Sequence, residues 1–313
     1  MARADRVVVI GEALIDVVEP TDGPAREHVG GSPANVAVGL ATLGHGTRLA
    51  AHIGRDDRGR RIVDHLQEHG VGLVDGSDRA VRTSTATARL DPQGGAGGAT
   101  YVFDLTWEAP EVDLTGAGHL HAGSLGATVE PGGSAVLELM SRARDSVTVS
   151  YDPNLRPTLM GEPHEVRGRI EECIGRSDVV KASEEDIEWL YVGAPLAEVA
   201  HLWGLLGPSV VVVTRGGDGA LVHLTSTDTD HQQAGRRVEV VDTVGAGDSF
   251  MTGLLSGLLD ADLLGGTQAR ERLRAASLED VLPAVERAVD CASYTVERAG
   301  AAAPTRSELG ITD

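Results

Sequence analysis

The stretch DTVGAGDSF, residues 242–250, joins two different periodicities in the sequence. The β-branched run 238–241 precedes it and predicts a strand, whereas Phe250, Leu254 and Leu258 follow it at the spacing of one helical face. A strand that passes through small residues into a helix brings unpaired backbone amides and the positive end of the helix dipole to one point. The stretch therefore predicts an anion site at the start of a helix.

Four residues of this turn are candidates for chemistry. The amides of Gly245, Ala246 and Gly247 are expected to stabilise a phosphoryl group in transfer. Asp248 lies in the first helical turn and would accept the proton of an attacking hydroxyl, a role that contributes roughly 10²–10⁴-fold to a rate. The alternative for Asp248 is a plain helix cap. We favour the base, because a carboxylate beside an anion site is useful when it takes a proton or holds a metal.

Other phosphate-binding motifs are absent from the sequence. A Walker A loop needs Gly-Lys-Ser or Gly-Lys-Thr, and the single lysine, Lys181, lies between Val180 and Ala182. The protein-kinase motifs are missing as well. The first predicted strand runs into Ile-Gly-Glu-Ala at residues 10–13, which lacks the dinucleotide fingerprint and disfavours a nicotinamide-dependent dehydrogenase.

Short apolar runs alternate with helical patterns along most of the chain, which predicts an α/β sandwich with a mostly parallel, buried sheet. The predicted strands are residues 6–10, 48–53, 147–151, 179–181, 210–214 and 238–241. The predicted helices are residues 34–43, 60–69, 134–144, 184–191 and 250–259.

One region departs from this alternation. Residues 84–90 and 100–105 read as two β-runs on either side of a glycine-rich stretch at 91–98, and residues 14–19 have a similar character. Together they predict a small sheet that projects from the main domain. A plain surface loop at 91–98 is an equally weighted alternative.

Composition excludes several classes of partner. The chain has 313 residues, 41% of them hydrophobic, and a formal charge of −20, which argues against nucleic acid and anionic membranes as partners. Two distant cysteines, Cys173 and Cys291, do not make a disulfide framework and fit a reducing compartment. We find no signal peptide pattern and no apolar run of transmembrane length, so a cytoplasmic location is expected.

Two segments carry a family resemblance. Residues 242–248 resemble the second signature of the ribokinase-like (PfkB) carbohydrate kinases, and residues 30–37, GGSPANVA, resemble the first. Gly54 to Gly59 fits the short element that follows it. The family implies a three-layer α/β/α sandwich over residues 1–313, with a mostly parallel central sheet. It also implies a small β-sheet lid, formed here by segments near residues 12–30 and 83–106.

The first signature also has a physical interpretation. Ser32 can cap a helix, Pro33 suits its first position, and the Asn35 amide offers two donors and an acceptor to sugar hydroxyls. The resemblance implies that the sugar is held by Asp16, Gly31 and Asn35, with Gly30 beside them. It assigns further contacts with the sugar to Tyr101 and Phe103 of the lid.

Residues 152–156, DPNLR, resemble an element of the fructokinase branch, in which Arg156 would steady phosphate or sugar. An exposed arginine in a turn is the alternative.

The segment 181–186 resembles the family's magnesium and phosphate motif with two departures, Ser183 for Asn and Asp186 for Glu. Lys181 and Ser183 are assigned to the nucleotide and Asp186 to magnesium; an acidic helix start is the alternative for Asp186.

The resemblance implies the remaining nucleotide and ion contacts. Besides Lys181 and Ser183, the nucleotide is assigned to Thr214, Gly216, Gly219, Gly245, Gly247 and Ser293. A potassium site is assigned to Asp242 and the carbonyl of Val244.

These observations predict an ATP- and Mg²⁺-dependent small-sugar kinase, with fructose as the first substrate and a homodimer as the expected assembly. The alternatives are a kinase for 2-keto-3-deoxygluconate, ribose, another ketose or a nucleoside. An alternative from another class is a non-catalytic regulator that binds sugar or nucleotide.

Overall fold

Two sheets organise residues 7–20, 23–90 and 99–311, which are the residues that the computed structural model describes. The large sheet has nine strands, and neighbouring strands are parallel except at one edge, where β11 pairs with β12 and β12 pairs with β13 in antiparallel fashion. Their order is β13 (Thr229–Gln233), β12 (Ala220–Leu224), β11 (Val210–Thr214), β10 (Val179–Ser183), β9 (Thr148–Asp152), β8 (His119–Gly123), β1 (Val7–Ile10), β4 (Thr47–Ala50) and β5 (Gly72–Leu73).

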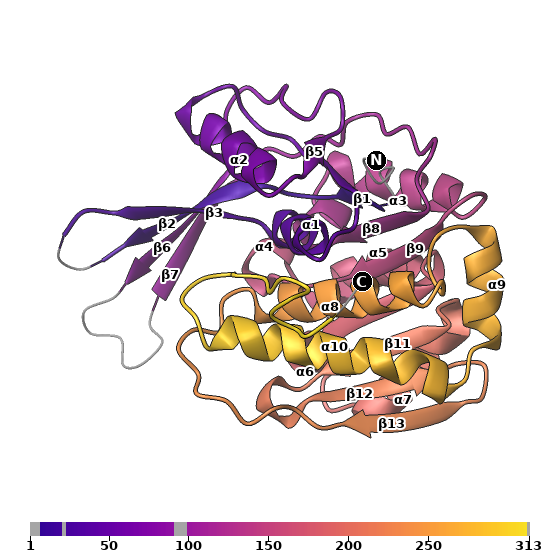
Figure 1. The fold of residues 1–313 in the computed structure, drawn as a ribbon. Helices are drawn as coiled ribbons and strands as arrows, with labels where there is room; N and C mark the ends of the chain where they lie inside the picture. Colours follow the sequence, from indigo (N-terminus) through magenta and orange to yellow (C-terminus); the bar gives the residue numbers. More distant parts are fainter. Residues whose placement is uncertain (1–6, 21–22, 91–98, 312–313) are drawn as a thin grey trace.

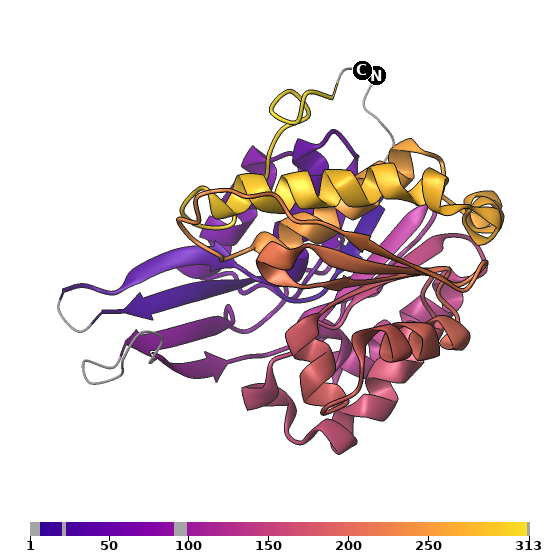
Figure 2. The ribbon, with the colours of Figure 1, turned by 90° about the horizontal axis from the view of Figure 1, so that it is seen from below.

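Helices cover both faces of the large sheet (Figures 1 and 2). One face packs against α1 (Ser32–Thr42), α2 (Asp57–Glu68), α8 (Ala246–Asp260), α9 (Thr267–Ala275) and α10 (Leu278–Val296). The other packs against α3 (Gly132–Ala143), α5 (Pro163–Gly175), α6 (Glu184–Leu190) and α7 (Leu196–Leu206). Short turns of helix complete the chain at α4 (Pro157–Met160), η1 (Ser124–Ala127) and η2 (Gly216–Asp218). The predicted three-layer α/β/α sandwich is confirmed.

Side-chain alternation explains why one sheet serves two cores. Val7 and Val9 of β1 face the core beneath α1 and α8, whereas Val8 and Ile10 face the core beneath α3 and α5. All four are buried. A strand that is apolar at every position is therefore stable only between two helical layers, as its continuous apolar run predicts.

The small sheet stands apart from the sandwich, in the order β3 (Arg26–Gly30), β2 (Leu14–Glu19), β6 (Thr85–Leu90) and β7 (Ala99–Asp104). It projects to one side of the main domain (Figure 1). Its strands lie within the two segments predicted for the lid. The predicted loop at 91–98 lies outside the described residues, as does Arg6 of the first predicted strand.

The predicted strand at residues 238–241 is wrong. The chain leaves the sheet at the edge strand β13 and runs without strand pairing to the start of α8. Val240 and Val241 are about 60% exposed, and the Val241 amide donates to the Val296 carbonyl of α10 over 2.7 Å. A β-branched run has strand propensity, but a strand also needs a neighbouring strand to complete its hydrogen bonds.

A buried ion pair holds α9 to the amino-terminal edge of the sheet. The Arg270 Nε donates to Asp178 Oδ1 over 2.6 Å, and both side chains are less than a tenth exposed. The Arg270 guanidinium also donates to the carbonyls of Arg144 and Val147, and Asp178 Oδ2 accepts from the Val149 amide of β9. The pair therefore satisfies several buried groups at once.

We expect Arg270→Ala to lower the free energy of unfolding by about 3–5 kcal/mol, because it leaves the Asp178 carboxylate buried without its counter-charge. Urea unfolding followed by circular dichroism measures this change. Arg274→Ala is the matched control on α9: it removes only an exposed pair with Glu271 and should change stability by less than about 1 kcal/mol. Equal losses in the two variants would contradict this role for Arg270.

Candidate active site

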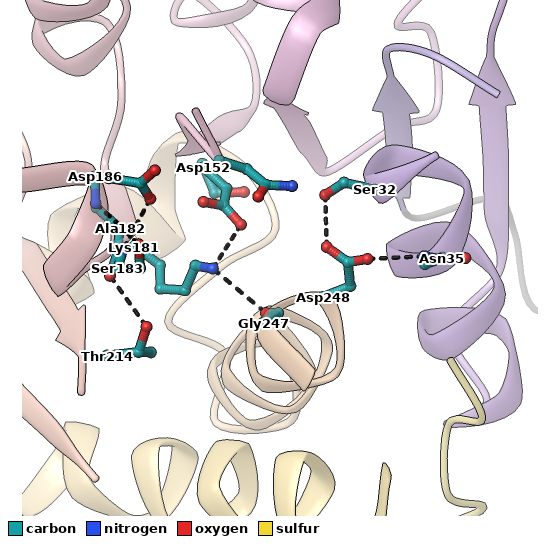
Figure 3. A network of polar contacts seen from close by, with 12 residues as sticks. Ser32, Asn35, Asp152, Lys181, Ala182, Ser183, Asp186, Thr214, Gly247 and Asp248 are labelled. Atoms are coloured by element: carbon teal, nitrogen blue, oxygen red, sulfur yellow. Dashed lines mark hydrogen bonds and ion pairs between the residues drawn. The ribbon is translucent and has the colours of Figure 1, made fainter. Parts of the chain in front are cut away.

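The candidate catalytic group lies where two helices begin. Asp248, in the first turn of α8, accepts from Ser32 Oγ over 2.6 Å at Oδ1 and from Asn35 Nδ2 over 2.8 Å at Oδ2 (Figure 3). Both donors are in the first turn of α1, more than 200 residues away in sequence. Two hydrogen bonds orient the carboxylate, and each oxygen keeps a lone pair for a further donor.

The prediction that Ser32 caps α1 is wrong. Gly31 occupies the cap position, without any side-chain hydrogen bond, and Ser32 is the first helical residue. The Ser32 hydroxyl donates to Asp248 instead. A serine directly before a proline is a common pattern for a helix cap. The sequence does not show that the Ser32 hydroxyl meets a carboxylate more than 200 residues away.

The turn before α8 has the geometry of an anion site. Gly245 adopts a left-handed conformation with φ 75°, and a Cβ there would lie 2.4 Å from the Cβ of Ala301. Only glycine is compatible with both constraints. Of the three predicted amides, that of Ala246 donates to the Thr243 carbonyl over 3.3 Å, whereas among the described residues no backbone acceptor is found for the amides of Gly245, Gly247 and Asp248. These amides and the dipole of the 15-residue helix are therefore available to a negative group.

Asp242 joins this turn to the loop near the end of the chain. Its Oδ1 accepts from the Val244 amide over 3.0 Å, and its Oδ2 accepts from the Gly300 amide over 2.9 Å. The amides of Gly300 and Val244 hold the pKa of Asp242 below its ordinary value, so the carboxylate is ionised. Its predicted role at a potassium ion stays a prediction, as does that of the Val244 carbonyl.

The single lysine of the chain is buried beside the turn. Lys181, on β10, lies 2.8 Å from Asp152 Oδ2, and its Nζ donates to the Gly247 carbonyl over 3.4 Å (Figure 3). Burial raises the pKa of Asp152 to about 6, against the effect of Lys181. Burial alone would lower the pKa of Lys181, but the Asp152 carboxylate raises it, so the pair is ionised at neutral pH.

Asp152 was not among the predicted site residues. It ends β9, and its Oδ1 is buried without a hydrogen-bond partner among the described residues. A buried carboxylate oxygen without a donor is costly unless a ligand or ion completes it. The signal available in sequence was its place at the end of a predicted strand, next to Pro153.

Asp186 and Ser183 form a reciprocal cap at the start of α6. The Ser183 hydroxyl accepts from the Asp186 amide over 3.0 Å, and Asp186 Oδ2 accepts from the Ser183 amide over 2.9 Å. Asp186 Oδ1 accepts from the Leu155 amide over 2.8 Å, which ties α6 to the turn after β9. Both oxygens thus have a structural partner and retain capacity for a cation. Thr214 donates to the Ala182 carbonyl over 3.3 Å beside them.

Arg156 lies at the start of α4 in the same turn. Its guanidinium donates to the side chain and carbonyl of Asn154 and to the carbonyl of Leu155, and the residue is exposed. Burial raises the pKa of Asp16 above its ordinary value, and the positive charge of Arg156 offsets part of this increase. The Arg156 guanidinium therefore acts electrostatically on Asp16, one of the predicted sugar residues.

Two adjacent glycines shape the predicted sugar site. A Cβ at Gly30 would lie 1.9 Å from Asp16 Oδ2, and one at Gly31, where φ is 104°, would lie 2.5 Å from the Glu12 carbonyl. The glycines thus leave room for the Asp16 carboxylate and for close approach of the first helix. The negative charge of Asp248 also contributes to the raised pKa of the Asp16 carboxyl group.

Strand register brings a residue of the predicted lid to the same face of the small sheet as Asp16. Asp16 is opposite Ala86, and Ala86 is opposite Phe103, so the three side chains point to one face of the small sheet. Tyr101 is two residues along β7 from Phe103.

The remaining predicted nucleotide residues lie in other elements. Gly216 and Gly219 form the left-handed positions of the turn between β11 and β12, with φ values of 50° and 93°. Ser293 lies within α10, where its hydroxyl donates to the Val289 carbonyl over 2.7 Å. Two surface hollows of about 530 and 670 Å³ lie elsewhere, and none of the predicted site residues lines them.

Known proteins resemble this chain over nearly its whole length. The pfkB family of carbohydrate kinases matches residues 4–308. A fructokinase from Escherichia coli is 32% identical over 315 residues, which cover 97% of this chain and 98% of that protein.

Solved structures show the same similarity. A fructokinase from Xylella fastidiosa with bound ATP superposes with a TM-score of 0.83 at 25% identity, covering 98% of each chain. A double mutant of fructokinase from Vibrio cholerae O395, in a form with fructose, ADP and potassium ion bound, superposes with a TM-score of 0.79 at 26% identity, covering 99% of each chain. This chain belongs to the pfkB family of carbohydrate kinases.

Proposed function

We propose that this kinase transfers the γ-phosphoryl group of ATP to a primary hydroxyl of fructose. The observation that carries the proposal is the Asp248 carboxylate, oriented by Ser32 and Asn35 at the start of a helix with free amides. The similarity to the E. coli fructokinase and to the fructose- and ADP-bound V. cholerae structure supports fructose as the substrate.

The proton and the phosphoryl group move in opposite directions in this mechanism. Asp248 accepts the hydroxyl proton while the sugar oxygen forms a bond to the γ-phosphorus, and the bond from that phosphorus to the bridging oxygen of ADP breaks. The amides at Gly247 and Asp248 stabilise the negative charge on the transferring group. Lys181 adds a fixed positive charge behind the Gly247 carbonyl.

Asp152 and Asp186 fit a divalent cation at the same edge of the sheet. The unpartnered Asp152 Oδ1 and the remaining lone pairs of Asp186 are hard oxygen donors of the kind that Mg²⁺ prefers. When bound, Mg²⁺ would neutralise charge on the nucleotide phosphates. ATP-bound and potassium-bound neighbours support ATP and K⁺ as further ligands.

We also propose that the enzyme is a cytoplasmic homodimer that pairs through its small sheets. Both cysteines are buried thiols, which suits a reducing compartment. The outer strands β3 and β7 each have one strand neighbour, so each offers an edge for pairing. Across the described part of the chain, no helix combines the length and apolar character needed to span a bilayer.

The activity is tested by a coupled ADP-release assay with fructose, ribose, 2-keto-3-deoxygluconate and nucleosides, with and without potassium. We expect the highest kcat/KM with fructose.

Asp248→Asn should lower kcat at least ~10²-fold with little change in fructose affinity, because it removes the proton acceptor and keeps the shape of the side chain. Near-normal turnover in this variant would eliminate Asp248 as the base, and sugar binding without any turnover in the wild type would favour a regulator.

Asn35→Ala should raise the KM for fructose about 10-fold and leave the KM for ATP nearly unchanged, since its amide is expected to contact the sugar. Ser32→Ala is the matched variant, because it also removes one donor to Asp248 but lies outside the predicted sugar contacts. It should lower kcat with a smaller effect on the KM for fructose. A change confined to the KM for ATP in Asn35→Ala would overturn the assignment of the sugar site.

Lys181→Met should lower kcat and also destabilise the fold by about 3–5 kcal/mol, because Asp152 is left as an unpaired buried charge. The double variant with Asp152→Asn removes that charge and should recover most of the stability. We expect its kcat to stay low, because the positive charge beside Gly247 is still missing and a proposed Mg²⁺ ligand has been removed as well. Full recovery of kcat in the double variant would show that Lys181 acts only through folding.

A further inference from the structure

A group of histidine and aspartate side chains lies at the β13 edge of the large sheet. His201 is on α7, His223 on β12, Asp228 in the turn that follows β12, and Asp230 on β13. Helix α7 packs on β12, and β12 pairs with β13 (Figure 1). None of these residues belongs to the predicted kinase site.

Three of the side chains converge as metal ligands do. His201, His223 and Asp228 each offer one ligand atom, and these atoms all lie within 4.8 Å of one another. His201 Nδ1 and Asp228 Oδ1 are 2.8 Å apart, and the two imidazole rings are 5.6 Å apart at an interplanar angle of 80°. The three ligands come from three different elements of the fold, so tertiary packing builds the group.

The fourth side chain orients the buried histidine. His223 is opposite Asp230 in the antiparallel ladder, and its Nδ1 lies 2.8 Å from Asp230 Oδ1. An aspartate that accepts from Nδ1 leaves Nε2 with a free lone pair, which is the outer-shell arrangement common around metal-bound histidines. A Cβ at Gly204 would lie 3.1 Å from His223 Nε2, so this nitrogen faces the helix that carries His201.

We propose that His201, His223 and Asp228 bind a divalent transition-metal ion such as Zn²⁺, with Asp230 as the outer-shell partner of His223. Two imidazoles, one carboxylate and a water make a four-coordinate site of the kind that zinc accepts. The ion would join α7 to the β12–β13 turn.

The side chains need only small movements to form this site. Bonds of about 2.0–2.1 Å to a tetrahedral ion place the ligand atoms roughly 3.3 Å apart. The His201–Asp228 pair must open slightly, and the longer separations must close by up to ~1.5 Å. His201 and Asp228 are 44% and 70% exposed and can adjust, whereas His223 is only 3% exposed and is held in place.

The test measures zinc binding to the tag-free, full-length chain after chelator treatment, by isothermal titration calorimetry in excess Mg²⁺. We expect one Zn²⁺ per chain, with affinity at least 10-fold weaker in His201→Ala and in Asp228→Asn. Asparagine suits the left-handed conformation of residue 228, where φ is 48°, so this variant keeps the turn. His164→Ala removes an exposed histidine on α5 and should bind as the wild type does.

Two further readouts separate a metal site from simple His–Asp hydrogen bonds. Asp230→Asn should weaken zinc binding about 10-fold or more, although the residue is not a ligand. Zinc at ~100 times the wild-type Kd should raise the thermal midpoint by about 5 °C in the wild type and by no more than about half of that in His201→Ala. Absence of binding at 100-fold excess zinc over chain, or equal binding in His201→Ala and the wild type, would overturn the proposal. Kinase activity with Mg²⁺ is independent of either result.

Discussion

The contact between helices α1 and α8 is the constraint on which the candidate site depends. A Cβ at Gly39 would lie 2.6 Å from Thr252 Oγ1, so the helices approach closely only because residue 39 is glycine. This approach brings the amino-terminal turns of both helices together, and Asp248 thereby meets Ser32 and Asn35. The carboxylate is fixed by packing between two helices as much as by its own hydrogen bonds.

Electrostatics at the site run against the charge of the whole chain. The formal charge is −20, yet the first turn of α8 presents two amides without a backbone acceptor, those of Gly247 and Asp248, at the positive end of the helix dipole. Helix amides supply part of the positive potential, and the buried Lys181 and the exposed Arg156 add to it. Asp152 holds this ammonium in place, so a lysine can stay ionised where burial would otherwise favour its neutral form.

The charged groups discussed here lie on both sheets of the molecule. The parallel strands β9 and β10 carry the buried charges Asp152 and Lys181, and the small sheet carries Asp16, whose pKa the charge of Asp248 helps to raise. The β12–β13 edge holds its own cluster of imidazoles and carboxylates, with no residue in common with the kinase site.

The sequence by itself determined the sandwich, and it predicted the anion turn and Asp248 as the base, because periodicity and glycine placement are local properties. It misassigned residues 238–241 and the role of Ser32, and it passed over Asp152. A strand, a cap and a buried ion pair each depend on a partner far along the chain, and only tertiary structure supplies that partner: Val296 for Val241, Asp248 for Ser32, and Lys181 for Asp152. The local sequence pattern specifies which interactions a side chain or amide can make, and long-range packing decides which residue becomes its partner.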